Sequence, residues 1–153
     1  MASFIGEYVC KLDAKGRFLL PSGLKRQLDP AAQEKFVLNR GFEGCLVLYP
    51  ANEWEKITSQ LEKLNLFVAK NRKFYRQFHN GATPLTLDGN GRILLPKPLS
   101  GFAGIDKEAV LFAYSNRIEV WAKDRYDQVM NEDLDDFANL AEDVMGDLDA
   151  EAE

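Results

Sequence analysis

A nine-residue motif occurs twice in this chain of 153 residues. Asp13-Ala-Lys-Gly-Arg-Phe-Leu-Leu-Pro21 returns 75 residues later as Asp88-Gly-Asn-Gly-Arg-Ile-Leu-Leu-Pro96, with six of the nine positions identical. An internal repeat constrains a fold more strongly than any single residue, because each copy must adopt the same local structure. The sequence therefore predicts a molecule built from two copies of one unit.

Each motif has the composition of a tight turn between two strands. Asp is favoured at the first position of such a turn and Gly at the last. Apolar and polar residues alternate loosely over residues 4–12 before the first turn, and residues 17–20 follow it as a second strand. Residues 84–87 and 92–95 flank the second turn in the same way. We therefore predict two strand–turn–strand hairpins, each ended by a proline.

The repeat extends beyond the motif. Short apolar segments at 36–38 and 45–49 predict a hairpin in the first copy, and the segments 109–114 and 117–121 predict its counterpart in the second. Each pair leads into helical sequence. The sequence thus predicts a β-rich α+β protein with two tandem units.

Helical sequence separates and follows the two units. After the second unit, apolar residues step by three and four, which predicts one amphipathic helix with an acidic outer face that ends near Gly146. The apolar residues of this helix are Met130, Leu134, Phe137, Ala141, Val144 and Leu148. The predicted boundaries are 4–52 for the first unit, 53–82 for a helical connector, 83–126 for the second unit, and 127–153 for the acidic helix and tail.

The net charge of −5 is unevenly distributed along the chain. Residues 131–153 hold ten acidic residues and no Lys or Arg. Residues 1–130 therefore hold 14 acidic residues against all 19 basic ones, a net charge of +5. The positive net charge of residues 1–130 is compatible with a polyanion as a partner, although the pI of the whole chain would argue against one.

Compartment and solubility follow from simpler features. No apolar run approaches the ~18–20 residues that cross a membrane, and the N-terminus lacks the pattern of a signal peptide. Cys10 and Cys45 are the only cysteines, and both stand at apolar, strand-like positions. We expect a cytoplasmic protein with two reduced, buried cysteines and no membrane association.

No residue pattern points to catalysis or to a metal. His79 is the only histidine, has no matched nucleophile and ends a basic segment, so we interpret it as a surface or structural residue. Asp13 and Asp88 are explained by their turns. An EF-hand beginning at Asp88 fails because Leu99 stands where a Glu ligand is required. We therefore expect no enzymatic activity, no metal, no cofactor and no small-molecule substrate.

The arginine of each motif is not required by the turn. One interpretation is that Arg17 and Arg92 pair with Asp13 and Asp88 and stabilise the hairpins. The other is that they point outward to DNA, since a two-stranded ribbon fits the major groove and Arg binds guanine through two hydrogen bonds. Lys15 adds a charge suited to phosphate in the first turn, whereas Asn90 takes its place in the second.

A basic segment over residues 70–76 is a further candidate. It is either a second contact to phosphate or a solvated helix face that balances the acidic tail, and we favour the solvated face.

The two Asp-x-x-Gly-Arg-x-x-x-Pro motifs, each followed by a strand pair and a helix with an aromatic residue, resemble the MraZ family over residues 4–130. That family consists of bacterial transcriptional regulators related to the AbrB and MazE DNA-binding proteins. The resemblance implies two tandem AbrB-like swapped-hairpin units that form one pseudo-symmetric domain with flanking helices. It also implies closed homo-oligomeric rings, commonly octamers or dodecamers, and a nucleoid-associated protein.

The resemblance further implies a partner and a site. The partner is double-stranded DNA, at repeated boxes upstream of the division and cell-wall gene cluster. The positions that contact DNA in the family correspond here to Lys15, Arg17 and Arg92. The residues expected to brace the hairpins are Asp13, Gly16, Asp88 and Gly91. An alternative from another class is a protein-interaction scaffold, or an antitoxin-like binder of another protein, on the same fold.

Overall fold

The computed structural model describes residues 3–132 and 136–152, and in it the two repeats show the same order of elements. The first repeat contains β1 (Phe4–Lys11), β2 (Arg17–Leu19), α1 (Ser22–Lys25), β3 (Lys35–Arg40), β4 (Leu46–Pro50) and α2 (Ala51–Leu61). The second contains β5 (Thr83–Thr86), β6 (Arg92–Leu94), α4 (Lys97–Ala103), β7 (Glu108–Ser115), β8 (Arg117–Ala122) and α5 (Lys123–Asn131). The predicted strands are thus confirmed to within two residues.

The remaining elements are short connections and two helices. The 3₁₀ turns η1 (Pro30–Ala32) and η2 (Phe42–Gly44) precede β3 and β4, α3 (Ala69–His79) lies between the repeats, and α6 (Phe137–Ala152) follows α5. By internal contacts the chain divides into two compact units, Met1–Lys123 and Asp124–Glu153. The sheet, the ribbon and the helices up to α4 all belong to the first unit.

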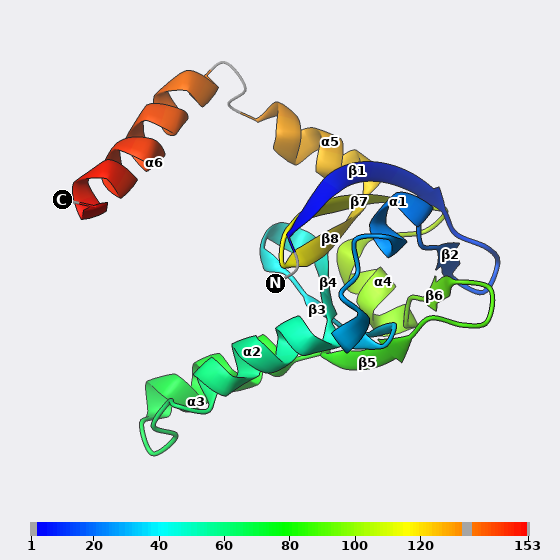
Figure 1. The fold of residues 1–153 in the computed structure, drawn as a ribbon, viewed down its shortest axis with the longest axis horizontal. Helices are drawn as coiled ribbons and strands as arrows, with labels where there is room; N and C mark the ends of the chain where they lie inside the picture. The colour runs from blue at the N-terminus through cyan, green and yellow to red at the C-terminus, as the bar shows by residue number, and fades with distance from the viewer. Residues whose placement is uncertain (1–2, 133–135, 153) are drawn as a thin grey trace. The chain divides into compact units, whose positions relative to one another are not determined.

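Six strands form an antiparallel sheet in the order β1-β7-β8-β4-β3-β5. The two repeats are arranged symmetrically in this sheet. If each strand is replaced by its counterpart in the other repeat, the same order results, read from the opposite edge. The first strand of each repeat pairs with a strand of the other repeat, β1 with β7 and β5 with β3. Figure 1 shows this clearly for β1 (blue), which runs beside β7 (yellow). The sheet therefore needs both repeats.

The prediction of two local hairpins is correct for the turns and wrong for the strands that follow them. After each turn, β2 and β6 leave the preceding strand and pair with each other in a separate two-stranded ribbon. In this ribbon Phe18 lies opposite Ile93. Both side chains are buried, at 1% and 0% exposure. The pairing is favoured because it buries the apolar residue of both motifs on one face, against the core.

One cluster of buried side chains joins the sheet to the ribbon, α1 and α4. Its members on the ribbon and the two short helices are Phe18, Leu20, Leu24, Ile93, Leu95, Leu99 and Ala103. Cys10 and Cys45 are buried free thiols, as predicted. Burial raises the pKa of the Cys45 thiol to about 12, so this thiol stays protonated at neutral pH.

α2 and α3 form a helical hairpin that extends away from the sheet (Figure 1). Trp54 of α2 stacks on Phe78 of α3, with ring centroids 5.6 Å apart and planes 7° from parallel. The ring of His79 stacks on Tyr75 at 4.2 Å and has a nitrogen 2.9 Å from the Tyr75 carbonyl oxygen. His79 thus lies within the packing of the hairpin, in line with a structural role.

The C-terminal region differs from the single helix that we expected. α5 ends at Asn131, and a separate helix, α6, begins at Phe137. The expected core position Leu134 lies outside the described residues. Gly146 does not end regular structure, since α6 continues through it to Ala152. A glycine in a helix interior costs only ~0.5–1 kcal/mol relative to alanine, and no proline follows to stop the helix.

Candidate nucleic-acid interface

The side chain of Asp13 closes the first turn. Its Oδ1 accepts hydrogen bonds from the backbone N–H groups of Lys15 at 3.0 Å and Arg17 at 2.9 Å. Its Oδ2 accepts a hydrogen bond from Arg17 Nε at 2.7 Å. The Gly16 N–H donates to the Asp13 carbonyl at 3.0 Å, and Gly16 has a φ of +87°, where glycine is favoured. One carboxylate therefore fixes both the turn and the arginine that follows it.

The second turn repeats this geometry. Oδ1 of Asp88 accepts hydrogen bonds from the N–H groups of Asn90 at 2.9 Å and Arg92 at 2.8 Å, and its Oδ2 accepts one from Arg92 Nε at 2.9 Å. Gly91 has a φ of +75°. The two turns are therefore equivalent in structure. They differ in charge at the tip, where the exposed Lys15 corresponds to the exposed, uncharged Asn90.

These hydrogen bonds lower the pKa of both aspartates. The backbone N–H of Arg17 has the largest effect on the pKa of Asp13, and the Arg17 side chain lowers it further. The backbone N–H of Arg92 likewise lowers the pKa of Asp88 most. The turns thus favour the ionised carboxylates, which are the forms that bind the arginines.

The ribbon brings the two turns together. In its antiparallel register, Arg17 lies opposite Leu94 and Leu19 lies opposite Arg92. Successive side chains of a strand point to opposite faces. Because the residue between each Arg and Leu is buried, these four side chains share the outer face. Leu19 and Leu94 are 60% and 49% exposed there.

An ion pair also crosses between the turns. Nη1 of Arg92 lies 3.9 Å from Oδ2 of Asp13, which already accepts the hydrogen bond from Arg17. The carboxylate of the first motif therefore lies near both arginines. This contact places the charged groups of the two turns next to each other on the ribbon.

The two interpretations of the arginines are not exclusive in this geometry. The pairing with Asp13 and Asp88 is present, and in each case Nε makes the short contact. The side chains of Arg17 and Arg92 nevertheless remain 27% and 30% exposed. A guanidinium group carries five N–H donors, so bracing the turn through Nε leaves capacity for a second partner.

Two lysines outside the repeated motifs, Lys97 and Lys107, also lie near the first turn. A surface cavity of about 340 Å³ is lined by Asp13 and Lys15 together with Lys97, Asp106 and Lys107. Lys107 is held there because its carbonyl accepts a hydrogen bond from the N–H of the residue before Asp13, at 2.8 Å. Lys97 directly follows the second motif, so its place in the sequence could have identified it as a candidate site residue.

The basic segment 70–76 lies on α3, away from this surface. Figure 1 shows α3 and the β2–β6 ribbon at opposite sides of the first unit. Arg72 of this helix uses Nη1 to bind the Leu66 carbonyl at 2.9 Å, at the turn between α2 and α3. The same short stretch of DNA would therefore not contact both the ribbon and α3, which favours the solvated face for this segment.

Within residues 3–132 and 136–152, no group of three or more His, Cys, Asp or Glu side chains is arranged to hold a metal ion. None of the helices described is both long and apolar enough to span a bilayer.

Comparison with known proteins adds to this geometry. The family model described as "MraZ protein, putative antitoxin-like" matches residues 3–77 and again residues 78–147. A protein of Christiangramia forsetii named transcriptional regulator MraZ is 49% identical over 150 residues, covering 97% of each chain. Proteins of the same name from Flavobacterium psychrophilum and Lactobacillus delbrueckii subsp. bulgaricus are 45% and 44% identical. They cover 97% and 92% of this chain, and 95% and 96% of their own lengths.

Proposed function

The chain belongs to the MraZ family, and from this premise we propose that it is a sequence-specific DNA-binding transcriptional regulator that acts as a homo-oligomeric ring. The observation that carries the proposal is the β2–β6 ribbon, which presents Arg17 and Arg92 on one outer face. The names of its relatives support the regulatory role.

The ribbon suits direct reading of bases. The major groove admits a two-stranded ribbon, and an arginine within it can bind O6 and N7 of guanine through two hydrogen bonds. Asp13 and Asp88 orient the arginines before DNA arrives, which lowers the entropy cost of binding. The exposed Leu19 and Leu94 add apolar surface beside each arginine, of the kind that contacts a thymine methyl group.

Lysines around the first turn would contact phosphates. Lys15, Lys97 and Lys107 surround one cavity beside the ribbon. Each phosphate contact releases a counterion, so we expect affinity to fall steeply with salt concentration. The second turn has Asn90 at its tip, so the two ends of the ribbon would hold the backbone unequally.

A single ribbon offers few contacts, so repetition has to supply affinity. In our proposal, two AbrB-like swapped-hairpin units form each subunit, and an octameric or dodecameric ring repeats the ribbon around its rim. Repeated boxes upstream of the division and cell-wall gene cluster would then engage several subunits at once. Such linked binding can raise avidity by ~10²–10⁴ without new contacts. The protein would act in the cytoplasm, on the nucleoid.

The test is Arg17→Ala, measured by gel shift on a promoter fragment with repeated boxes and by sedimentation velocity. Loss of one bidentate guanine contact costs about 1–3 kcal/mol, so we expect affinity per subunit to fall roughly 5- to 150-fold, with assembly unchanged. Arg76→Ala, the same substitution at an exposed position of α3, is the control and should bind as the wild type does. Unchanged affinity of Arg17→Ala would refute the assignment. Loss of assembly would instead support a purely bracing role.

A protein-binding function on the same fold is favoured by one observation, an aromatic groove on the first unit that is described below. Affinity for duplex DNA that does not change with salt, together with tight binding of another protein, would favour this alternative.

A further inference from the structure

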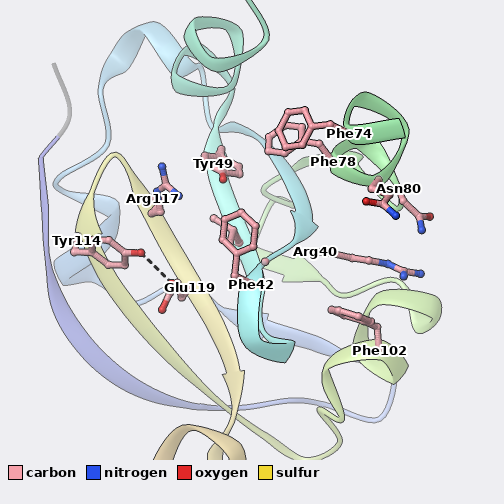
Figure 2. A pocket seen from close by; sticks show the side chains of 13 residues that line it. Arg40, Phe42, Tyr49, Phe74, Phe78, Asn80, Phe102, Tyr114, Arg117 and Glu119 are labelled. Atoms are coloured by element: carbon pink, nitrogen blue, oxygen red, sulfur yellow. Dashed lines mark hydrogen bonds between the residues drawn. The ribbon is translucent and has the colours of Figure 1, made fainter. Parts of the chain in front are cut away.

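The first unit carries a groove of about 400 Å³ between α3 and the sheet. Figure 2 shows Phe74 and Phe78 of α3 on one side, with Phe42 and Tyr49 beside them. Phe102 of α4 closes another side. Phe42 is 77% exposed and Phe74 is 46% exposed, so the groove presents aromatic rings to solvent.

Two arginines line the same groove. The guanidinium group of Arg40 stacks 4.6 Å from the ring centre of Phe102, and that of Arg117 stacks 5.3 Å from the ring centre of Tyr49. Nε of Arg40 is buried yet has no hydrogen-bond acceptor among the described residues. A buried donor without an acceptor costs free energy, and aromatic and arginine side chains are enriched at protein interfaces. The groove therefore resembles one side of a protein–protein interface.

A matching projection lies at the end of the same helical hairpin. The turn between α2 and α3 exposes three consecutive apolar residues, Leu66, Phe67 and Val68, at 45%, 96% and 41%. Hydrogen bonds hold this tip in one shape. The Phe67 N–H donates to Asn65 Oδ1 at 3.0 Å, and Arg72 Nη1 donates to the Leu66 carbonyl at 2.9 Å. The tip is thus a preorganised apolar surface rather than a loose loop.

The tip of a subunit cannot enter that subunit's own groove. Phe67 precedes α3, whereas Phe78, which lines the groove, lies near its end. A helix rises ~1.5 Å per residue, so these positions are about 16 Å apart along the axis. A tip can therefore fill a groove only on another molecule.

We propose that the apolar tip of one copy, centred on Phe67, inserts into the aromatic groove of a second copy. The match of apolar surfaces supports this occupant. Phe67 is the most exposed residue of the tip, at 96%, and the groove offers the rings of Phe42, Phe74 and Phe78, against which a phenylalanine can pack. Because two different surfaces meet, the contact is head-to-tail, and repetition of such a contact gives either a closed ring or a filament. The inference rests on the homo-oligomer of the proposed function and names the surfaces that build it.

The test uses full-length protein and sedimentation velocity. Phe67→Asp should weaken self-association roughly 30-fold or more, as expected for a central interface aromatic. Phe42→Asp, in the groove, should do the same. Both positions are highly exposed, so both variants should keep the wild-type circular dichroism spectrum. Phe137→Asp, the same substitution at a 66% exposed phenylalanine of α6, is the control and should assemble normally.

Mixing the two variants gives the sharper result. The Phe67→Asp copy retains an intact groove, and the Phe42→Asp copy retains an intact tip. At a concentration where neither variant assembles alone, a 1:1 mixture should therefore form heterodimers. A mixture that stays monomeric, or a Phe67→Asp variant that assembles as the wild type does, overturns the inference. So does dissociation caused by Phe137→Asp alone, which would assign the contact to α6.

The same experiment separates this inference from the proposed function. Wild-type protein that sediments as a monomer would contradict the ring and the inference together. An assembled wild type with an equally assembled Phe67→Asp variant would contradict the tip-and-groove contact alone. The DNA surface is tested independently by Arg17→Ala, because the tip lies on the opposite side of the unit from the ribbon (Figure 1).

Discussion

Replacing Ile93 by alanine tests whether the ribbon is anchored as the structure shows. Ile93 is fully buried and lies opposite Phe18 in the β2–β6 register. The substitution removes about three carbon atoms, and at ~0.8 kcal/mol each the lost burial is roughly 2.4 kcal/mol. A cavity adds to this, so we expect the free energy of unfolding to fall by about 3–4 kcal/mol, within the range for large-to-small core changes.

Leu94 is the matched control for this prediction. It is the next residue of the same strand, and its side chain is 49% exposed on the outer face. Leu94→Ala should change the free energy of unfolding by no more than ~0.5 kcal/mol, as is usual at the surface. If the outer face contacts DNA, the same variant should nevertheless bind DNA more weakly than the wild type. The pair thus separates stability from binding at adjacent positions.

Urea denaturation of the wild type and both variants, followed by circular dichroism at one fixed protein concentration, measures these differences. The concentration must be held constant because self-association also stabilises the folded state. A loss below about 1 kcal/mol for Ile93→Ala, or an equal loss for Leu94→Ala, would show that the faces of the ribbon are assigned wrongly.

Two further predictions concern the turns. Asp13 and Asp88 have a pKa below the ordinary value of 3.8, so the stability they contribute should be complete above that pH and should be lost as the pH falls through their lowered pKa. Urea midpoints measured from pH 6 down to the acid limit should decline less for Asp13→Asn than for the wild type, and parallel curves would contradict this. Gly16→Ala should cost about 1–2 kcal/mol, because Gly16 has a φ of +87°. An unchanged midpoint for this variant would mean that the turn relaxes.

The turns could be predicted from sequence because their chemistry is local. Asp, Gly and Arg stand within five residues of one another, and the hydrogen bonds of Asp13 and Asp88 follow from that spacing. The alternation of apolar residues was also enough to place the strands. Both kinds of signal depend only on near neighbours in the chain.

The pairing of the strands could not be predicted in the same way. Periodicity shows that Phe18 and Ile93 face the core, but not that they face each other across the ribbon. The lysines beside the first turn were missed for a related reason. Lys107 lies beside the first turn because β1 pairs with β7, and the Leu12 N–H donates to the Lys107 carbonyl at the end of this pairing.

The C-terminal helix shows a different limit of prediction from sequence. A step of three and four residues continues from Met130 to Leu148, yet the structure ends α5 at Asn131 and begins α6 at Phe137. Spacing reports which residues would share a face, but it does not report whether the helix is continuous between them. Gly146 is the opposite case, because the sequence predicts a helix end there and the structure has none. A helix can continue through a glycine when favourable residues surround it.

The pairing of β1 with β7 affects how this protein must be made. β1 leaves the ribosome well before its partner, which begins at Glu108. At ~5–20 residues per second, the first strand waits roughly 5–20 s before its partner has been synthesised. During that time the backbone edge of β1 that pairs with β7 has no native partner. The sheet of the first repeat therefore cannot be completed before the second repeat is made, because β1 and β3 each pair with a strand of the second repeat.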